Sequence, residues 1–192
     1  MQEQIKQAIQ EIAKYAQRPD FSNIEVVKYN MLFLYQVMLA TTGMLEEAIK
    51  HSEGQLKEYF ISHLAEEQHH AEWLAEDLLE LGVDVMKQPT KRHAAAMAGT
   101  QYYLIKHVKP ECLLGYMATI EGFPASLEFV EYIESIHGKK PFRTLRIHAE
   151  EDVTHAQELF DIIEQYQCPE ILENAIETQI YLNELSHVLR HI

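Results

Sequence analysis

Residues 142–162 read FRTLRIHAEEDVTHAQELFDI, and their apolar side chains recur with the spacing of one helix face. Four apolar residues define that face: Phe142, Leu145, Leu159 and Ile162. Three polar residues lie among them, at successive spacings of four and three: His148, Asp152 and His155. A stripe of this kind packs into a core. The stretch therefore predicts a buried helix that directs one carboxylate and two imidazoles inward.

A second stretch, residues 56–81, has the same organisation. Its apolar stripe consists of Leu56, Phe60, Leu74, Leu78 and Leu81. His63, Glu67 and His70 occupy the intervening positions of the stripe, again four and three residues apart. Side chains with these spacings share one helix face. We expect this helix, too, to aim a carboxylate and imidazoles at the interior.

The remainder of the chain continues the helical pattern, broken by Pro, Gly and polar clusters. We expect seven helices, at roughly residues 2–17, 24–51, 55–81, 90–108, 110–138, 141–167 and 169–192. No segment alternates apolar and polar residues for long enough to predict a strand. A chain of 192 residues without a linker predicts one all-α domain spanning residues 1–192.

The composition of the chain limits the kinds of partner and the cellular compartment that we expect for the protein. The formal net charge of −14 repels nucleic acid and anionic lipid, so we expect neither as a partner. The chain has no apolar run of about 18 residues and no apolar segment near its start, which predicts neither a membrane span nor a signal peptide. Two cysteines without CxxC spacing fit a reducing cytosol. These features predict a cytoplasmic protein.

The inward carboxylates require cations, because an unpaired ionised carboxylate is costly to bury. No Lys or Arg lies between residues 58 and 86, so basic side chains near the first cluster are scarce. Imidazole and carboxylate without thiolate suit iron or manganese, and zinc remains compatible. The competing interpretation is that the clusters are structural and pair with each other. Two inward clusters of matching spacing favour a metal site.

A third candidate carboxylate lies in residues 114–124, LGYMATIEGFP, which are apolar apart from Thr119 and Glu121. Pro124 cannot donate a backbone hydrogen bond, so we expect the helix to kink beside Glu121. Such a kink, with the small Gly122 next to it, leaves room for a metal or a substrate. The alternative is a plain bend with Glu121 at its edge.

Three motifs resemble the haem-oxygenase-like diiron oxidases, which include CADD-like proteins and belong to the wider TenA and PqqC fold group. The motifs are HLAEEQHH at 63–70, GYMATIEG at 115–122 and HAEEDVTH at 148–155. The resemblance implies a seven-helix haem-oxygenase-like bundle that binds two iron ions, or manganese, and uses dioxygen. It implies six metal ligands: Glu67, His70, Glu121, His148, Asp152 and His155.

The first motif allows two ligand pairs, because Glu66 and His69 form a second ExxH pair beside Glu67 and His70. We prefer Glu67 and His70 because they lie on the apolar stripe. His63 is interpreted as a residue that hydrogen-bonds a ligand carboxylate, or as part of the core. Asp77 is a candidate for the same supporting role.

The resemblance implies an iron- and dioxygen-dependent oxidoreductase that acts on a small organic substrate or a protein tyrosine. The expected assembly is a homodimer. Three alternatives remain. A ferritin-like diiron protein uses two ExxH motifs and further Glu, but not a third imidazole such as His148. A metal-free TenA- or PqqC-like enzyme needs a catalytic Cys or a hydrogen-bonding pocket. A non-catalytic helical interaction protein needs no metal.

Overall fold

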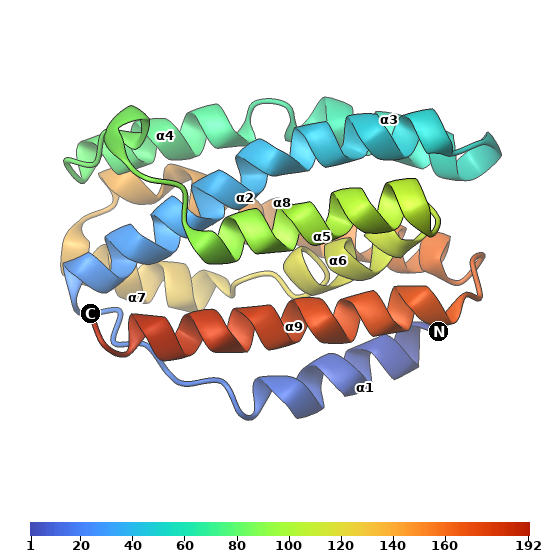
Figure 1. Cartoon of the computed structure of the whole chain (residues 1–192). Coiled ribbons are helices and arrows are strands. Elements are labelled where there is room, and N and C mark those ends of the chain that lie inside the picture. Colours follow the sequence, from blue (N-terminus) through green and yellow to red (C-terminus); the bar gives the residue numbers. More distant parts are fainter.

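Nine α-helices and two 3₁₀ turns build the described backbone of this computed structural model (Figure 1). The structure describes the backbone of residues 1–192 and the side chains of residues 1–150 and 155–192. The elements are α1 (Gln2–Ala13), α2 (Ile24–His51), α3 (Gly54–Glu67), α4 (His70–Glu80), η1 (Val85–Lys87), α5 (Arg92–His107), α6 (Cys112–Ile120), α7 (Leu127–His137), η2 (Lys140–Phe142), α8 (Arg143–Ile163) and α9 (Pro169–Leu189). The all-α prediction is confirmed, but the predicted count of seven is wrong.

The two additional helices arise because two predicted helices are each interrupted once. The helix expected over residues 55–81 divides into α3 and α4 at Gln68 and His69, where the backbone of His69 has φ −111° and ψ −7°. The helix expected over residues 110–138 divides into α6 and α7. Both interruptions fall beside predicted metal ligands, since α3 ends at Glu67, α4 begins at His70 and α6 is capped by Glu121.

Pro124 explains why the second interruption is a complete break rather than the predicted kink. Proline supplies no backbone N–H and disfavours helical geometry in the residue before it. The last helical bond of α6 runs from the N–H of Glu121 to the carbonyl of Met117, at 2.8 Å. The chain becomes helical again only after Ser126, whose hydroxyl accepts a hydrogen bond from the N–H of Phe129. Glu121 is therefore the C-terminal cap of α6, at the point where the helix stops.

The helices run roughly alongside one another, with α3 and α4 along one edge and α9 and α1 along the opposite edge (Figure 1). α6 lies against α9 so closely that a Cβ added at Gly115 would come within 2.1 Å of the carbonyl oxygen of Ile171. Only glycine permits this approach. On its other side α6 contacts α8, which also packs on α4 and α7. The space among α3, α4, α6 and α8 is where the inward polar residues gather.

Neutral polar side chains occupy the interior between α5, α6 and α9. Asn174 of α9 accepts a hydrogen bond from the Gln101 amide at 3.2 Å and donates to Gln101 at 2.8 Å and to the carbonyl of Cys112 at 2.7 Å. Thr119 donates to the carbonyl of Ala175 at 3.0 Å. We call Gln101, Asn174 and Thr119 the amide seam. It ties α5 and α6 to α9.

Among the described residues, none of the helices combines the length and the apolar character needed to cross a bilayer.

Candidate metal centre

The inner face of α3 and α4 carries three of the predicted site residues. His63, Glu67 and His70 are exposed to only 3%, 7% and 4%. The rival pair, Glu66 and His69, lies on the outside of the bundle with exposed side chains. The structure therefore places the preferred pair of the HLAEEQHH segment in the interior and leaves the alternative pair in solvent.

Glu67 and His70 meet across the interruption between α3 and α4. The Nδ1 atom of His70 lies 3.0 Å from Oε1 of Glu67. The indole of Trp73 lies against the outer side of the His70 ring, with centroids 4.9 Å apart. The two side chains stay in contact although α3 ends at Glu67 and α4 begins at His70.

Glu121 is brought to the same interior by the end of α6. Its side chain is exposed to 10%, and its Oε2 atom lies 3.1 Å from Nε2 of His63. Gly122 closes the turn tightly, because a Cβ there would lie 2.3 Å from the carbonyl oxygen of Ala118 and 3.1 Å from the ring of Phe160. The ligand expected at position 121 is thus paired with the residue that the sequence suggested as its support.

α8 supplies the facing imidazoles. The His148 ring lies 4.6 Å from the His70 ring, and the His155 ring lies 6.4 Å from the His63 ring, both in edge-to-face orientation. Both α8 histidines are partly buried. The structure therefore brings together five of the six predicted ligands, Glu67, His70, Glu121, His148 and His155. The sixth, Asp152, lies outside the described side chains.

The imidazoles and carboxylates of this cluster lie close together, but several of their atoms form no hydrogen bond within the described structure. His63 Nε2, Glu121 Oε2 and His70 Nδ1 are buried and have no hydrogen-bond partner among the described residues, although the two ion-pair distances are short. Buried polar atoms without hydrogen bonds are uncommon in native proteins and call for an explanation such as an ion. Imidazole nitrogens and carboxylate oxygens that are buried without hydrogen bonds are the kind of atoms that bind a metal ion.

The electrostatics of the cluster are those of paired opposite charges. Burial alone would raise the pKa of Glu67, but its contact with His70 and the charges of His70, His63 and His148 hold it below the ordinary value. Burial alone would lower the pKa of His63, but the Glu121 carboxylate more than offsets this and raises it to about 9. The raised pKa of His63 favours its imidazolium form, which neutralises the Glu121 carboxylate. Metal binding at Glu121 would take the place of that charge.

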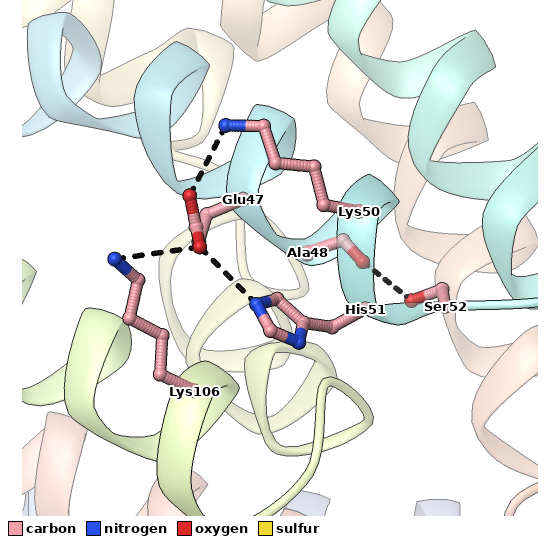
Figure 2. A network of polar contacts seen from close by, with 6 residues as sticks. All are labelled: Glu47, Ala48, Lys50, His51, Ser52 and Lys106. Carbon is pink, nitrogen blue, oxygen red and sulfur yellow. Dashed lines mark hydrogen bonds and ion pairs between the residues drawn. The ribbon is translucent and has the colours of Figure 1, made fainter.

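Lys and Arg neutralise carboxylates elsewhere in the chain but not here. Glu47 is surrounded by Lys50, His51 and Lys106, at 3.2, 3.2 and 3.4 Å (Figure 2). Glu134 receives two hydrogen bonds from Arg146, at 3.0 and 2.6 Å. Within the described side chains, no Lys or Arg forms an ion pair with Glu67 or Glu121. The interior carboxylates therefore face imidazoles alone.

The donors fit iron in their chemistry, since imidazole and carboxylate oxygen are ligands of non-haem iron. The described side chains as they stand do not form a group of three or more His, Cys, Asp or Glu that could hold a metal ion, and Asp152 is not among them. Surface clefts of about 380 and 480 Å³ are lined by other residues. The fit thus rests on donor type, burial and the atoms left without hydrogen bonds.

Asp77, the other supporting residue suggested by the sequence, acts on the helix that carries His148. Its Oδ2 atom accepts a hydrogen bond from the backbone N–H of Thr144, at 2.8 Å. Thr144 belongs to the first turn of α8, where backbone N–H groups lack helical partners. Asp77 therefore holds α8 against α4 one turn before His148, and its described hydrogen bond goes to the backbone of α8 rather than to a predicted ligand.

Sequence reasoning missed two neighbours of the cluster. The Tyr59 ring stacks on His63, with centroids 5.8 Å apart, and the spacing of four residues on one helix was the available signal. Glu66 was set aside as part of the rival pair, yet its Oε2 atom lies 3.8 Å from both Nδ1 of His63 and Nε2 of His155. An exposed carboxylate thus borders the buried imidazoles.

Comparison with known proteins identifies the family and the fold. Residues 33–181 match the model of a family described as iron-containing redox enzymes. A TenA homologue from Pseudomonas syringae pv. tomato str. DC3000 superimposes with a TM-score of 0.81 at 11% identity, covering 99% of this chain and 92% of that one. A domain of unknown function with a haem oxygenase-like fold from Shewanella denitrificans OS217 gives 0.76 at 12% identity, covering 97% and 89%. No curated protein matches the sequence.

At these identities the structural likeness shows the fold alone. The fold is haem oxygenase-like, as the motifs implied. That result removes the ferritin-like alternative, which requires a different bundle.

Proposed function

This chain belongs to the family of iron-containing redox enzymes, and from that premise we propose that it is a non-haem diiron oxidase or oxygenase. It would use dioxygen to oxidise a small organic substrate or a protein tyrosine. The proposal extends the family assignment in two respects, the number of iron ions and the use of dioxygen. Manganese is the alternative metal.

The observation that carries the proposal is the interior cluster on α3, α4, α6 and α8. Two buried carboxylates, Glu67 and Glu121, face only imidazoles and not Lys or Arg among the described side chains. Buried ionised groups persist when they are paired or coordinate metals. Three atoms of the cluster, His63 Nε2, His70 Nδ1 and Glu121 Oε2, are buried without hydrogen bonds to the described residues, which favours metal coordination.

We propose that Glu67, His70, Glu121, His148, Asp152 and His155 hold the metals. Three carboxylates offset positive charge, and three imidazoles complete the sets while leaving positions for dioxygen and substrate. When bound, iron supplies the electrons that dioxygen chemistry requires. The protein contributes placement: the α3–α4 break sets Glu67 opposite His70, and Asp77 anchors the start of α8. The fully buried Tyr116 and Leu74 help to seal the interior from water.

The metal-free TenA-like alternative is disfavoured by the state of the cysteines. Cys112 is fully buried, and burial raises the pKa of its thiol to about 11. A nucleophilic cysteine needs the opposite, a lowered pKa that populates the thiolate. Cys168 has its pKa raised by burial as well. A non-catalytic interaction protein would have no use for the buried carboxylates Glu67 and Glu121. A cytoplasmic homodimer without nucleic-acid or membrane partners stays a prediction of the sequence.

Anaerobic reconstitution with Fe(II), followed by removal of excess metal and elemental analysis, tests the proposal. We expect about two irons per chain and rapid dioxygen uptake on exposure to air. Glu67→Ala should lose at least one iron, whereas Glu66→Ala, which removes the exposed neighbour, should keep both. Protein that retains no iron, or retains iron equally in both variants, contradicts the proposal.

A further inference from the structure

The two cysteines of the chain stand outside the proposed metal centre, at the starts of two helices that pack on each other. Cys112 is the first residue of α6, and Cys168 is the N-cap residue of α9. Both are free thiols, with Cys112 buried and Cys168 half-buried. The sequence contains no other cysteine. An internal disulfide would therefore have to join these two residues.

Two contacts fix the register of α6 on α9. Gly115 lies against Ile171, since a Cβ at Gly115 would come within 2.1 Å of the Ile171 carbonyl oxygen. Farther along α6, the Thr119 hydroxyl donates a hydrogen bond to the carbonyl of Ala175, at 3.0 Å. Each contact joins residues 56 positions apart in the sequence. The two helices therefore run parallel, and they advance together residue by residue.

The same register places Cys112 opposite Cys168. Cys112 precedes Gly115 by three residues and Cys168 precedes Ile171 by three, so each cysteine lies about one turn before the close contact. Residues three positions apart share one helix face, which puts Cys112 on the side of α6 that faces α9. The first turn of α6 stays on α9, because the Asn174 amide donates to the carbonyl of Cys112 at 2.7 Å.

The two thiols also share their electrostatic surroundings. Burial is the main cause that raises the pKa of the Cys112 thiol to about 11, and negative charge on Cys168 is the next. The pKa of Lys109 is raised first by its hydrogen bond to Glu170 and further by negative charge on either cysteine. The Lys109 ammonium lies 3.0 Å from the Glu170 carboxylate, two residues after Cys168. Each thiol is therefore within electrostatic range of the other and of one lysine.

We propose that Cys112 and Cys168 are a redox-active pair that forms a disulfide between the first turns of α6 and α9. The oxidant is a small-molecule disulfide of the glutathione type. The thiolate of Cys168, the more exposed cysteine, attacks one sulfur of the oxidant and releases the first glutathione. The thiolate of Cys112 then attacks the Cys168 sulfur and releases the second. Each released glutathione takes up one proton, so two protein thiols are oxidised and one small disulfide is reduced.

The packing of the helices suits such a cross-link, which needs Cα atoms within about 7 Å of each other. The axes of ordinary packed helices lie about 8–10 Å apart, and the glycine contact one turn away brings the backbones of α6 and α9 closer than that. Burial raises the pKa of both thiols, so little thiolate exists at neutral pH and the exchange is slow. The pair therefore responds to sustained oxidation and stays reduced in an ordinary cytosol.

The cross-link stabilises the fold under oxidising conditions, because it closes the loop between Cys112 and Cys168 in the unfolded chain. It lies at the start of α6, whereas Glu121 caps the end of that helix. The chemistry of the pair needs no metal and does not depend on the proposed function.

Equilibration of the full-length protein in mixtures of reduced and oxidised glutathione tests the pair, because an equilibrium does not depend on how slowly the thiols react. After acid quenching and alkylation, peptide mapping should find a Cys112–Cys168 disulfide within single chains. The native protein should be half oxidised in a buffer at least about 10-fold more reducing than the same protein in urea, because native packing holds the thiols together. The oxidised protein should melt roughly 5–15 °C higher than the reduced protein.

Cys112→Ser and Cys168→Ser are matched controls that keep the size of each side chain. Neither variant should gain melting temperature on oxidation, and far-UV circular dichroism verifies that each is folded. If a variant does not fold, the comparison of native and urea-unfolded wild type decides. Glutathione attached to Cys168 beside a free Cys112, disulfides between chains, or equal oxidation in native buffer and urea would each overturn the inference. None of these outcomes changes the iron content that tests the proposed function.

Discussion

On the α9 side of α6, Asn174 and Gln101 bury neutral amides that bond each other and the backbone. On the side that faces α3, α4 and α8, Glu67 and Glu121 bury charges opposite imidazoles. Both regions are polar and shielded from solvent. In the amide seam the named groups have partners with ordinary hydrogen-bond geometry, whereas in the cluster three buried atoms have none among the described residues.

The difference separates polarity that stabilises a fold from polarity that is reserved for a ligand. A satisfied buried network fixes one arrangement of helices, while a half-satisfied one costs stability unless something completes it. We therefore expect substitutions in the amide seam to change stability and leave metal binding alone. Substitutions in the cluster should do the reverse.

The largest effect is expected for His70→Ala. Removing this imidazole should lower dioxygen uptake by at least about 100-fold and reduce the bound iron, because a metal ligand is lost rather than a neighbour of one. The melting temperature of metal-free protein should change little beside this. Elemental analysis, an oxygen electrode and thermal melts measure the three quantities. Uptake and iron content that stay near wild type would show that the comparison assigns the cluster wrongly.

The next effect is expected for Asn174→Ala, in the amide seam. Gln101 and the carbonyl of Cys112 would lose their buried partner, so we expect a loss of about 2–4 kcal/mol in the free energy of unfolding. For a chain of this size that corresponds to a fall of roughly 5–15 °C in melting temperature. Denaturant unfolding gives the free energy directly. Iron content should remain that of the wild type, and a parallel loss of iron would break the contrast.

Metal loading should raise the stability of the wild type by a smaller amount. Free Fe(II) at about three times the Kd of each site adds about 0.8 kcal/mol per site, or roughly 3–6 °C for two sites. Anaerobic melts with and without Fe(II) measure this shift. Asn174→Ala should show a similar shift from a lower starting temperature, whereas His70→Ala should show a much smaller one. Equal shifts in both variants would mean that iron binds outside the cluster.

The smallest effect is expected for Glu134→Gln, which alters a carboxylate that has its own cation. Arg146 holds the pKa of Glu134 below its ordinary value of 4.5. The stabilisation is therefore complete above about pH 4.5 and is lost as the pH falls through the lower pKa of the folded state. Thermal melts at pH 7 should show the variant a few degrees less stable, and the difference should shrink at pH 3. A difference that grows on acidification would contradict this assignment.

Helix periodicity was sufficient to predict the fold class and the inward residues. The stripe of residues 56–81 correctly placed His63, Glu67 and His70 inside and left Glu66 and His69 outside. Gly82, which directly follows that stretch, has φ +78° just after α4. Such patterns report which face is buried, and burial is what periodicity encodes. The identity of the metal ligands remains a prediction, for Asp152 most of all.

The interruptions of the helices were harder to predict. Pro124 gave a signal for the break after α6, although only a kink was expected. Gln68 and His69 gave none, since neither residue is a strong helix breaker. The pairing of His63 with Glu121 depends on how α6 ends relative to α3, a tertiary relation between residues 58 positions apart. Patterns along one helix do not contain such distances.

Trp73 is the chain's single tryptophan, and it lies against the ring of His70. Its intrinsic fluorescence should therefore report on a metal ion bound by His70, from within the native sequence. A paramagnetic ion such as Co(II) held by His70 should quench the emission. Metal binding by this residue could then be followed without an added dye.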